Sequence, residues 1–506
     1  MPCAAWAYTT VRPAEAVPPP VDAAVCVRED GGMHAQRKLL TLSLSVLLLL
    51  AAAVPVSASH EDRPSTKNLH PIGHIEEPRS GTALFNPAAP GDPNIHTDLA
   101  FWGNYAFQGT WLGFNVRDIS APGNPKQVSF TPCEGGQGDV VVWDDVLVRS
   151  WDGGAFSGAP PGRTCGVDED GEPIPVDEGF AGLHIFDISD LTAPELVGEV
   201  ELSGRPEADS PGCGSHTATG VPDLDNNRLL IYNGPSTAAC PWIEVIEVPL
   251  DDPGEAAFVR QVDTGRPCHD NGVILGDAML AACAGGNGFT VLELDPDALD
   301  DPQVLHSIDV NEVIEEEELE DGGEVSVGHS TAFSWDGEVL IFGHEPGGGV
   351  EARCQEDTPD TEKSAFFFEP RSGDFLGMWT LPRPQTANEN CTFHNFNVVP
   401  LRSGDRVFVH GSYQSGTGVV DFNDPANAVE IAWSDPPPIP VPENPIFCLP
   451  EGCELGGAWA SYWYNNFIYE TSIDEGLNIF RFSGRETAGA MRLPHLNPQT
   501  QEFTIP

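Results

Sequence analysis

The sequence predicts an all-β protein and, within that class, a seven-bladed β-propeller with four-stranded blades. Three observations predict this fold. A phrase of strand and turn residues recurs seven times, Gly (53) and Pro (47) are abundant among the 506 residues, and periodic helical patterns are nearly absent. Short strands joined by Gly- and Pro-rich turns, in units of roughly 45–75 residues, are typical of propeller blades.

The recurring phrase is an aromatic or aliphatic strand that ends in Asp-Ile-Ser or a similar turn, followed by a Pro and a Val/Ile-rich strand. Its clearest copies begin at Leu112, Leu183 and Phe289, and looser copies begin at Ile243, Ala365, Thr417 and Leu477. A further strand precedes each copy, at residues 104–109, 146–150, 228–232, 278–282, 338–343, 406–411 and 466–470. These strands alternate with period two, so each copy is expected to form the centre of one blade.

The last copy has no outer strand after Gly484, but residues 68–77 resemble an outer strand such as residues 194–201. An N-terminal strand that completes the last blade closes the ring and leaves no open edge between the first and last blades, and an open solenoid is the alternative. We therefore expect the propeller to span residues 68–484. Residues 59–67 are then a linker, and residues 485–506 are a C-terminal tail that either packs across one face or stays mobile.

Two copies of the phrase, residues 113–122 and 183–190, resemble the LVIVD repeat. The family that carries this repeat comprises predicted seven-bladed β-propellers, many of them exported, and the resemblance covers about residues 68–484. It implies a fold and a location. It implies no activity, because none is settled for the family.

Residues 1–58 are expected to be an N-terminal extension and a signal peptide. The apolar run 39–56 follows Arg37 and Lys38 and ends in small residues, which is the pattern of a secretory signal, and Met33 is the expected true start. An uncleaved membrane anchor is the alternative reading of the same run. After cleavage we expect a secreted or cell-surface protein with no stable membrane span.

Cysteine usage agrees with export, because ten of the twelve cysteines follow residue 58. An even number of cysteines in an exported chain indicates disulfides. Pairing sequential neighbours gives Cys133–Cys165, Cys213–Cys240, Cys268–Cys283, Cys354–Cys391 and Cys448–Cys453, although the sequence alone does not establish this connectivity.

The charge balance excludes some partners. Lys and Arg total 24 against 77 Asp and Glu, a formal net charge of −53, so the chain has no electrostatic footprint for nucleic acid or anionic membranes. The expected partner is an extracellular ligand or protein whose identity the sequence does not reveal. We expect the chain to be a monomer.

Histidine recurs where the first strand of each blade begins. His96, His216, His269, His329 and His394 occupy this place in five blades, and Asp139 occupies it in a sixth. First strands line the central channel of a propeller, so these six side chains are predicted to form a ring. Imidazole and carboxylate donors suit a transition-metal ion such as Cu, Zn or Fe.

Four neighbouring side chains are expected to orient the imidazoles: Asp98, Asp270, Asn271 and Asn395. His344, Glu345 and His410 lie near the ends of second strands and are less well placed. The alternative interpretation is that the repeated histidines are structural and hydrogen-bond between blades. Under either interpretation the channel mouth is the expected functional surface.

Two acidic turns, residues 168–172 and 223–227, place several oxygen atoms together as structural calcium loops do. Neither fits the twelve-residue spacing of an EF-hand, and solvated loops are the alternative.

Two functions remain open at this stage. The first is a secreted LVIVD-repeat propeller that acts as a ligand- or protein-binding scaffold through its channel mouth and its long inserts at 152–180, 312–324 and 433–456. The alternative is a metal-dependent enzyme, an oxidoreductase or a lyase, that uses the inner-strand histidines. No Gly-x-Ser-x-Gly elbow is present to favour a hydrolase.

Overall fold

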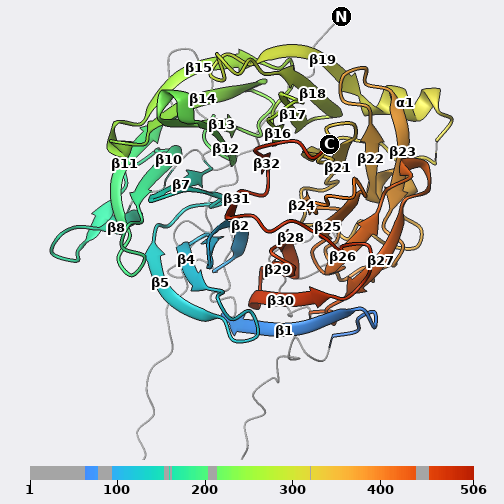
Figure 1. Cartoon of the computed structure of the whole chain (residues 1–506), viewed down its shortest axis with the longest axis horizontal. Coiled ribbons are helices and arrows are strands. Elements are labelled where there is room, and N and C mark those ends of the chain that lie inside the picture. The colour runs from blue at the N-terminus through green and yellow to red at the C-terminus, as the bar shows by residue number, and fades with distance from the viewer. Residues whose placement is uncertain are drawn as a thin grey trace, which may run out of the picture. The chain divides into compact units, whose positions relative to one another are not determined.

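The computed structural model describes residues 63–77, 94–152, 159, 162–202, 213–319, 321–439 and 455–506. Within them, seven sheets follow one another around a central axis (Figure 1). The predicted fold, a seven-bladed β-propeller, is confirmed. The predicted signal peptide and the start at Met33 lie outside the described residues.

Each blade is an antiparallel sheet whose first strand lies nearest the axis. Blade 1 contains β2 (His96–Trp102), β3 (Tyr105–Thr110), β4 (Gly113–Asp118) and β5 (Lys126–Pro132). Blade 2 contains β6 (Val140–Trp143), β7 (Val146–Trp151), β10 (Gly182–Asp187) and β11 (Glu195–Glu201), with a hairpin of β8 (Thr164–Val167) and β9 (Pro173–Pro175) inserted. Blade 3 contains β12 (Thr217–Asp223), β13 (Arg228–Gly234), β14 (Trp242–Pro249) and β15 (Ala257–Asp263).

The second half of the ring repeats this arrangement. Blade 4 contains β16 (Asp270–Ile274), β17 (Leu280–Gly285), β18 (Gly288–Glu293) and β19 (Gln303–Asp309). Blade 5 contains β20 (Gly328–Phe333), β21 (Leu340–His344), β22 (Ser364–Phe368) and β23 (Phe375–Thr380). Blade 6 contains β24 (Phe396–Val398), β25 (Val407–Gly411), β26 (Thr417–Asp421) and β27 (Val429–Ser434), and blade 7 begins with β28 (Ala458–Tyr464), β29 (Phe467–Ser472) and β30 (Gly476–Phe482).

The N-terminal strand β1 (Leu69–Glu76) is the outer strand of blade 7, as the sequence predicted. It pairs antiparallel with β30, from Leu69 opposite Phe482 to Glu76 opposite Gly476. Just before it, buried Arg63 forms ion pairs with Glu470 at 2.7 Å and Glu475 at 2.5 Å. The ring is therefore closed by backbone pairing and by a buried charge cluster.

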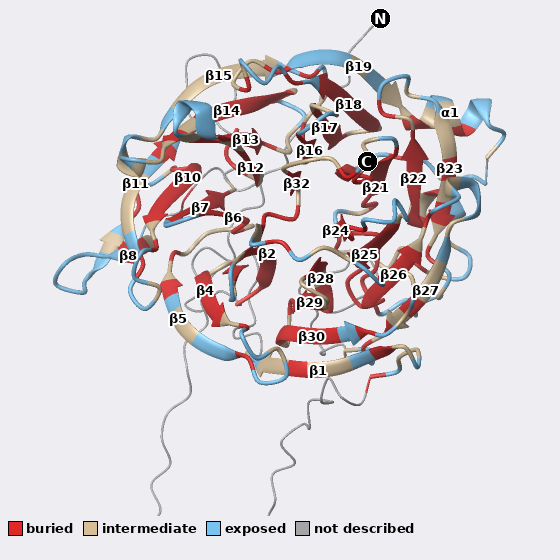
Figure 2. Ribbon diagram, in the orientation of Figure 1, coloured by how far each residue is buried: buried red, intermediate tan, exposed pale blue. Residues whose placement is uncertain are grey.

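Burial falls from the axis outward in each blade (Figure 2). In blade 4, for example, five of the six residues of β18 are buried, whereas β19 has none fully buried. The inner strands lie between neighbouring blades and pack on both faces, so most of their residues are buried, polar ones included. The outer strand of every blade also carries a register shift, which bends it around the rim.

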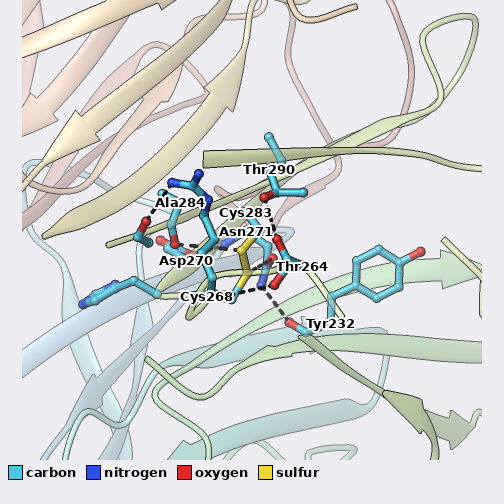
Figure 3. Close-up of a disulfide and its surroundings, with 12 residues drawn as sticks. Tyr232, Thr264, Cys268, Asp270, Asn271, Cys283, Ala284 and Thr290 are labelled. Carbon is cyan, nitrogen blue, oxygen red and sulfur yellow. Dashed lines mark hydrogen bonds between the residues drawn. A yellow bond between two sulfur atoms is a disulfide. The ribbon is translucent and has the colours of Figure 1, made fainter. Parts of the chain in front are cut away.

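Four of the five predicted disulfides are present: Cys133–Cys165, Cys213–Cys240, Cys268–Cys283 and Cys354–Cys391. Figure 3 shows that the third of these lies beside Asp270 and Asn271, at the start of β16. The fifth predicted pair, Cys448–Cys453, lies outside the described residues. Four disulfides fit an extracellular protein.

The acidic insert 312–324 is not simply a loop, because its first residues continue the helix α1 (Val310–Glu316). Asp309 caps this helix by accepting a hydrogen bond from the Asn311 amide, and Val310 and Ile314 pack against the core. Among the described residues, no helix is long and apolar enough to cross a membrane.

The C-terminal tail packs across one end of the channel (Figure 1). Its short strands β31 (His495–Leu496) and β32 (Thr500–Gln501) pair with the C-terminal ends of β2 and β16. Between them, the Asn497 side chain hydrogen-bonds to both the amide and the carbonyl of Val142, each at 2.9 Å. The tail thus covers the end of the channel where the inner strands finish.

Candidate functional site

A cavity of about 420 Å³ lies at the other end of the channel, where the inner strands begin. Its lining includes five of the six side chains predicted to form a ring: Asp139, His216, His269, His329 and His394. These residues come from blades 2 to 6. The predicted channel mouth is therefore a cavity, and five of the six predicted side chains lie on one part of its wall.

The four histidines form a continuous row across blades 3 to 6. The ring centroids are 4.2 Å apart for His216 and His269, 4.0 Å for His269 and His329, and 4.3 Å for His329 and His394. The Nε2 atoms of His216 and His269 are 2.9 Å apart. This spacing follows from the blade repeat, because each histidine begins the inner strand of its own blade.

Glu345, which directly follows β21, completes the row with a carboxylate. Its Oε1 lies 3.2 Å from Nε2 of His394, and its Oε2 lies 3.7 Å from Nε2 of His329. Tyr413 holds this carboxylate by donating a hydrogen bond to Oε1 at 2.5 Å. One potential ligand atom from each of His269, His329 and Glu345 lies within 4.8 Å of the other two.

The row is well suited to a cation. Burial first, and then the neighbouring imidazoles, hold the pKa values of His269 and His329 well below the usual value of 6.5, so both rings are neutral. The buried Nδ1 atoms of both rings have no hydrogen-bond partner among the described residues. The described lining contains carboxylates and no Lys or Arg. Neutral imidazoles beside a carboxylate offer lone pairs that a metal ion would satisfy.

The outer members of the row are oriented by neighbouring groups. Asp152 lies 3.0 Å from Nδ1 of His216, and the Trp459 carbonyl accepts a hydrogen bond from Nδ1 of His394 at 2.5 Å. In each case the contact orients the ring, and Nε2 lies toward the next member of the row, His269 for His216 and Glu345 for His394. Of the expected orienting residues, Asp98 and Asn395 line the cavity, whereas Asn271 donates to the Tyr232 carbonyl at 3.4 Å.

His96 departs from the predicted ring and does not line the cavity. Its Nε2 lies 2.9 Å from the Glu77 carbonyl oxygen, and burial lowers its pKa to about 4. The reason is register. His96 is the last paired residue before a register shift in β2, as Gly328 is in β20, so Thr97 occupies the place that His329 has in blade 5. A displacement of one residue turns a strand side chain away from the shared face.

Deeper in the channel lies a layer of carboxylates from Asp98, Asp139 and Asp270. Each accepts a hydrogen bond from the amide of the residue that follows it, at 2.8, 3.0 and 2.8 Å respectively. Burial and mutual repulsion raise the pKa values of Asp139 and Asp270 well above the usual range. The protonated form of Asp139 is therefore favoured, and in that form it is a poor metal ligand.

The sequence predicted that Glu345 is less well placed than the residues at the starts of first strands, because only first strands were compared. The signal was the pair His344-Glu345 at the end of the second strand of blade 5. His344 is buried away from the cavity, whereas Glu345 lines it. Thr97, Trp459 and Tyr413 also line the cavity and were not predicted as site residues.

The two acidic turns lie away from this cavity. In the first, Asp168 accepts hydrogen bonds from the amides of Asp170 and Glu172 at 2.9 Å each. In the second, Asp223 is paired with Arg228 at 2.7 Å, so its charge is already compensated. Structural calcium stays a prediction for both turns.

Comparisons with known proteins support the repeat. The family model described as LVIVD repeat matches residues 96–129 and 178–201, in blades 1 and 2, so the chain contains LVIVD repeats. No curated protein matches the chain. Among solved structures, the chain is similar to the Dos1 propeller (TM-score 0.46, 11% identity, 81% of this chain and 83% of that one) and to Chaetomium thermophilum Raptor (TM-score 0.42, 11% identity, 78% and 28%).

Proposed function

We propose that this LVIVD-repeat propeller is an exported binding scaffold that holds a transition-metal ion at its channel mouth and captures a small ligand there. The observation that carries the proposal is the convergence of His269, His329 and Glu345, whose ligand atoms lie within 4.8 Å of one another in the cavity wall. His216 and His394 flank this set and supply two further imidazoles.

The donor set favours Zn, Cu or Fe over Mg or Ca. Imidazole nitrogen suits borderline transition metals, whereas Mg²⁺ and Ca²⁺ prefer sites made of oxygen atoms alone. A metal on three protein ligands keeps positions open toward the cavity. A ligand atom entering from the mouth would complete the coordination.

The proposed location and assembly follow from the same features. Four disulfides favour an oxidising compartment, and closure of the ring by β1 leaves no blade edge that demands a second subunit. We therefore propose a secreted or cell-surface monomer.

Metal titration of the purified, chelator-treated protein tests the proposal. Calorimetry with Zn²⁺, Cu²⁺ and Fe²⁺ (the last under anaerobic conditions) should show one tight site per chain. His329→Ala and Glu345→Gln should each weaken that site by about 10- to 100-fold or more. His70→Ala is the matched control, because His70 is exposed on β1. A wild-type protein with no stoichiometric site, or variants that bind as tightly as wild type, would overturn the proposal.

A second candidate is a metal-dependent oxidoreductase, with a lyase as the other enzymatic option. One observation favours the oxidoreductase: two histidines and one carboxylate are the ligand set of non-haem Fe(II) oxygenases. Oxygen uptake by the Fe(II)-loaded protein, in the presence of candidate organic substrates and compared with His269→Ala, would test it. Uptake that is identical in the variant would exclude this use of the cavity.

A further inference from the structure

We infer that the organic ligand of this cavity is a small amine, a cation with an apolar body, rather than a carboxylate or a phosphate. The inference names the ligand class of the site proposed above and rests on that proposal for the place of binding. It comes from the part of the cavity wall that the histidine row does not occupy.

The wall on the side of blades 6, 7 and 1 is apolar and aromatic. Trp111, Trp459 and Tyr413 line it together with Leu455 and Val350, and these residues pack as one cluster. Both tryptophans are half-buried, so each keeps part of its surface toward the cavity. The Trp459 ring stands nearly perpendicular to Tyr413, at 87° and 6.2 Å between centroids. Such walls hold the apolar part of a ligand, and a tryptophan face attracts a cation.

The charges of the cavity favour the same ligand class. Asp98, Asp139, Asp152 and Glu345 line the cavity with carboxyl groups, and the described lining has no Lys or Arg. The nearby buried cation Arg149 is not available, because it donates to the carbonyls of Thr110 and Gly135 at 2.8 and 3.0 Å. Carboxylates with no Lys or Arg among the described lining residues favour a positively charged ligand over an anion.

The contrast between the two walls defines the shape of the ligand. The histidine row and Glu345 face the cavity from blades 3 to 6, and the tryptophans face it from blades 7 and 1. A volume of about 420 Å³ falls in the range of small-molecule sites. An aryl-alkyl amine places its ring against the tryptophans and its nitrogen among the carboxylates.

Three probes of nearly the same shape test the inference: phenethylamine, phenethyl alcohol and 3-phenylpropionate. Calorimetry is performed with each on the zinc-loaded protein and on the metal-free protein. We expect phenethylamine to bind about tenfold tighter than the alcohol in both forms, and 3-phenylpropionate to bind at least tenfold weaker than the alcohol.

Two variants separate the apolar and the charged contributions. Trp459→Leu should weaken all three probes by about tenfold in the metal-free protein. Asp152→Asn should reduce the preference for the amine over the alcohol by about fivefold in the metal-free protein. His70→Ala is again the control and should change neither.

The outcomes distinguish this inference from the metal proposal. Stoichiometric zinc binding, with the carboxylate bound as tightly as the amine or with no probe bound, overturns the amine inference and leaves the metal site. Amine preference in a protein that binds no metal overturns the metal site and leaves an organic-cation pocket.

Discussion

The two ends of the channel are built from the same strands but pair their polar groups to different extents, although Gln501 Nε2 in the tail also has no partner among the described residues. At the end covered by the tail, Asn497 pairs with both backbone groups of Val142, and Thr500 donates to the Gly220 carbonyl at 2.7 Å. At the mouth, buried ring nitrogens of His269 and His329 have no partner among the described residues. Buried polar groups are normally hydrogen-bonded, so groups left unpaired together mark a place kept for something else.

We infer from this difference that one end serves stability, and the function proposed above places binding at the other. The covered end ties blades together, whereas the mouth carries buried polar atoms that do not stabilise the fold by themselves. The predictions that follow test this division, and they begin with the largest expected effect.

Removal of residues 490–506 should destabilise the protein most. The segment buries Leu493, Leu496 and Ile505 against the largest core cluster and adds β31 and β32 to two inner strands. At about 1.5–3 kcal/mol for each apolar side chain, the loss is several kcal/mol, which corresponds to a drop in Tm on the order of 10 °C. Calorimetric melting of the truncated and full-length proteins measures it, and an unchanged Tm would contradict a structural role for the tail.

A matched pair of substitutions compares the two ends directly. Asn497→Leu leaves the amide and carbonyl of Val142 unpaired and should lower the free energy of unfolding by about 2–4 kcal/mol. His329→Leu removes a buried, unpartnered nitrogen and should change the free energy of unfolding by less than about 1 kcal/mol in the absence of metal. Urea denaturation measures both. Equal losses at the two ends would break the comparison.

Much of this could be predicted from the sequence, because a propeller repeats its pattern. Strand periodicity located the blades, and the missing outer strand after Gly484 predicted closure by β1. The recurring His at strand starts predicted four of the residues that now line the cavity. Local loops between neighbouring cysteines predicted the four disulfides that the structure describes.

The remaining features depend on register and on contacts between distant segments. His96 shares the sequence phrase of the other histidines, but it lies one position earlier than His329 relative to the register shift of its strand, so Thr97 lies at the cavity instead. Glu345 reaches the row from a second strand, and the tail covers the channel through side-chain contacts to several blades. A one-residue displacement leaves no local sequence signal. The same is true of a packing partner more than 300 residues away, such as Val142 for Asn497.

Acid should destabilise the protein through His96. Its folded pKa is about 4, mainly because of burial, whereas an unfolded histidine has a pKa near 6.5. The neutral ring therefore stabilises the fold fully above pH 6.5, and this stabilisation is lost as pH falls through 4, by up to about 3 kcal/mol. His96→Gln should reduce the loss of unfolding free energy between pH 7 and pH 5 by about 2 kcal/mol. An NMR titration that places the His96 pKa above 6 would contradict this prediction.

The smallest expected effect sharpens the comparison between blades 1 and 5. Thr97 occupies the place of His329 and donates only a hydrogen bond to the Gly138 carbonyl at 3.2 Å, so Thr97→His should bring a further imidazole to the cavity. We expect this variant to tighten zinc binding by about three- to tenfold, on the order of 1 kcal/mol. His96→Gln should leave zinc affinity unchanged, because His96 bonds to the Glu77 carbonyl outside the cavity. The opposite result, in which His96→Gln weakens zinc binding and Thr97→His does not strengthen it, would contradict this prediction. It would mean that His96 belongs to the ring of histidines and that the register of β2 does not decide which residue lies at the mouth.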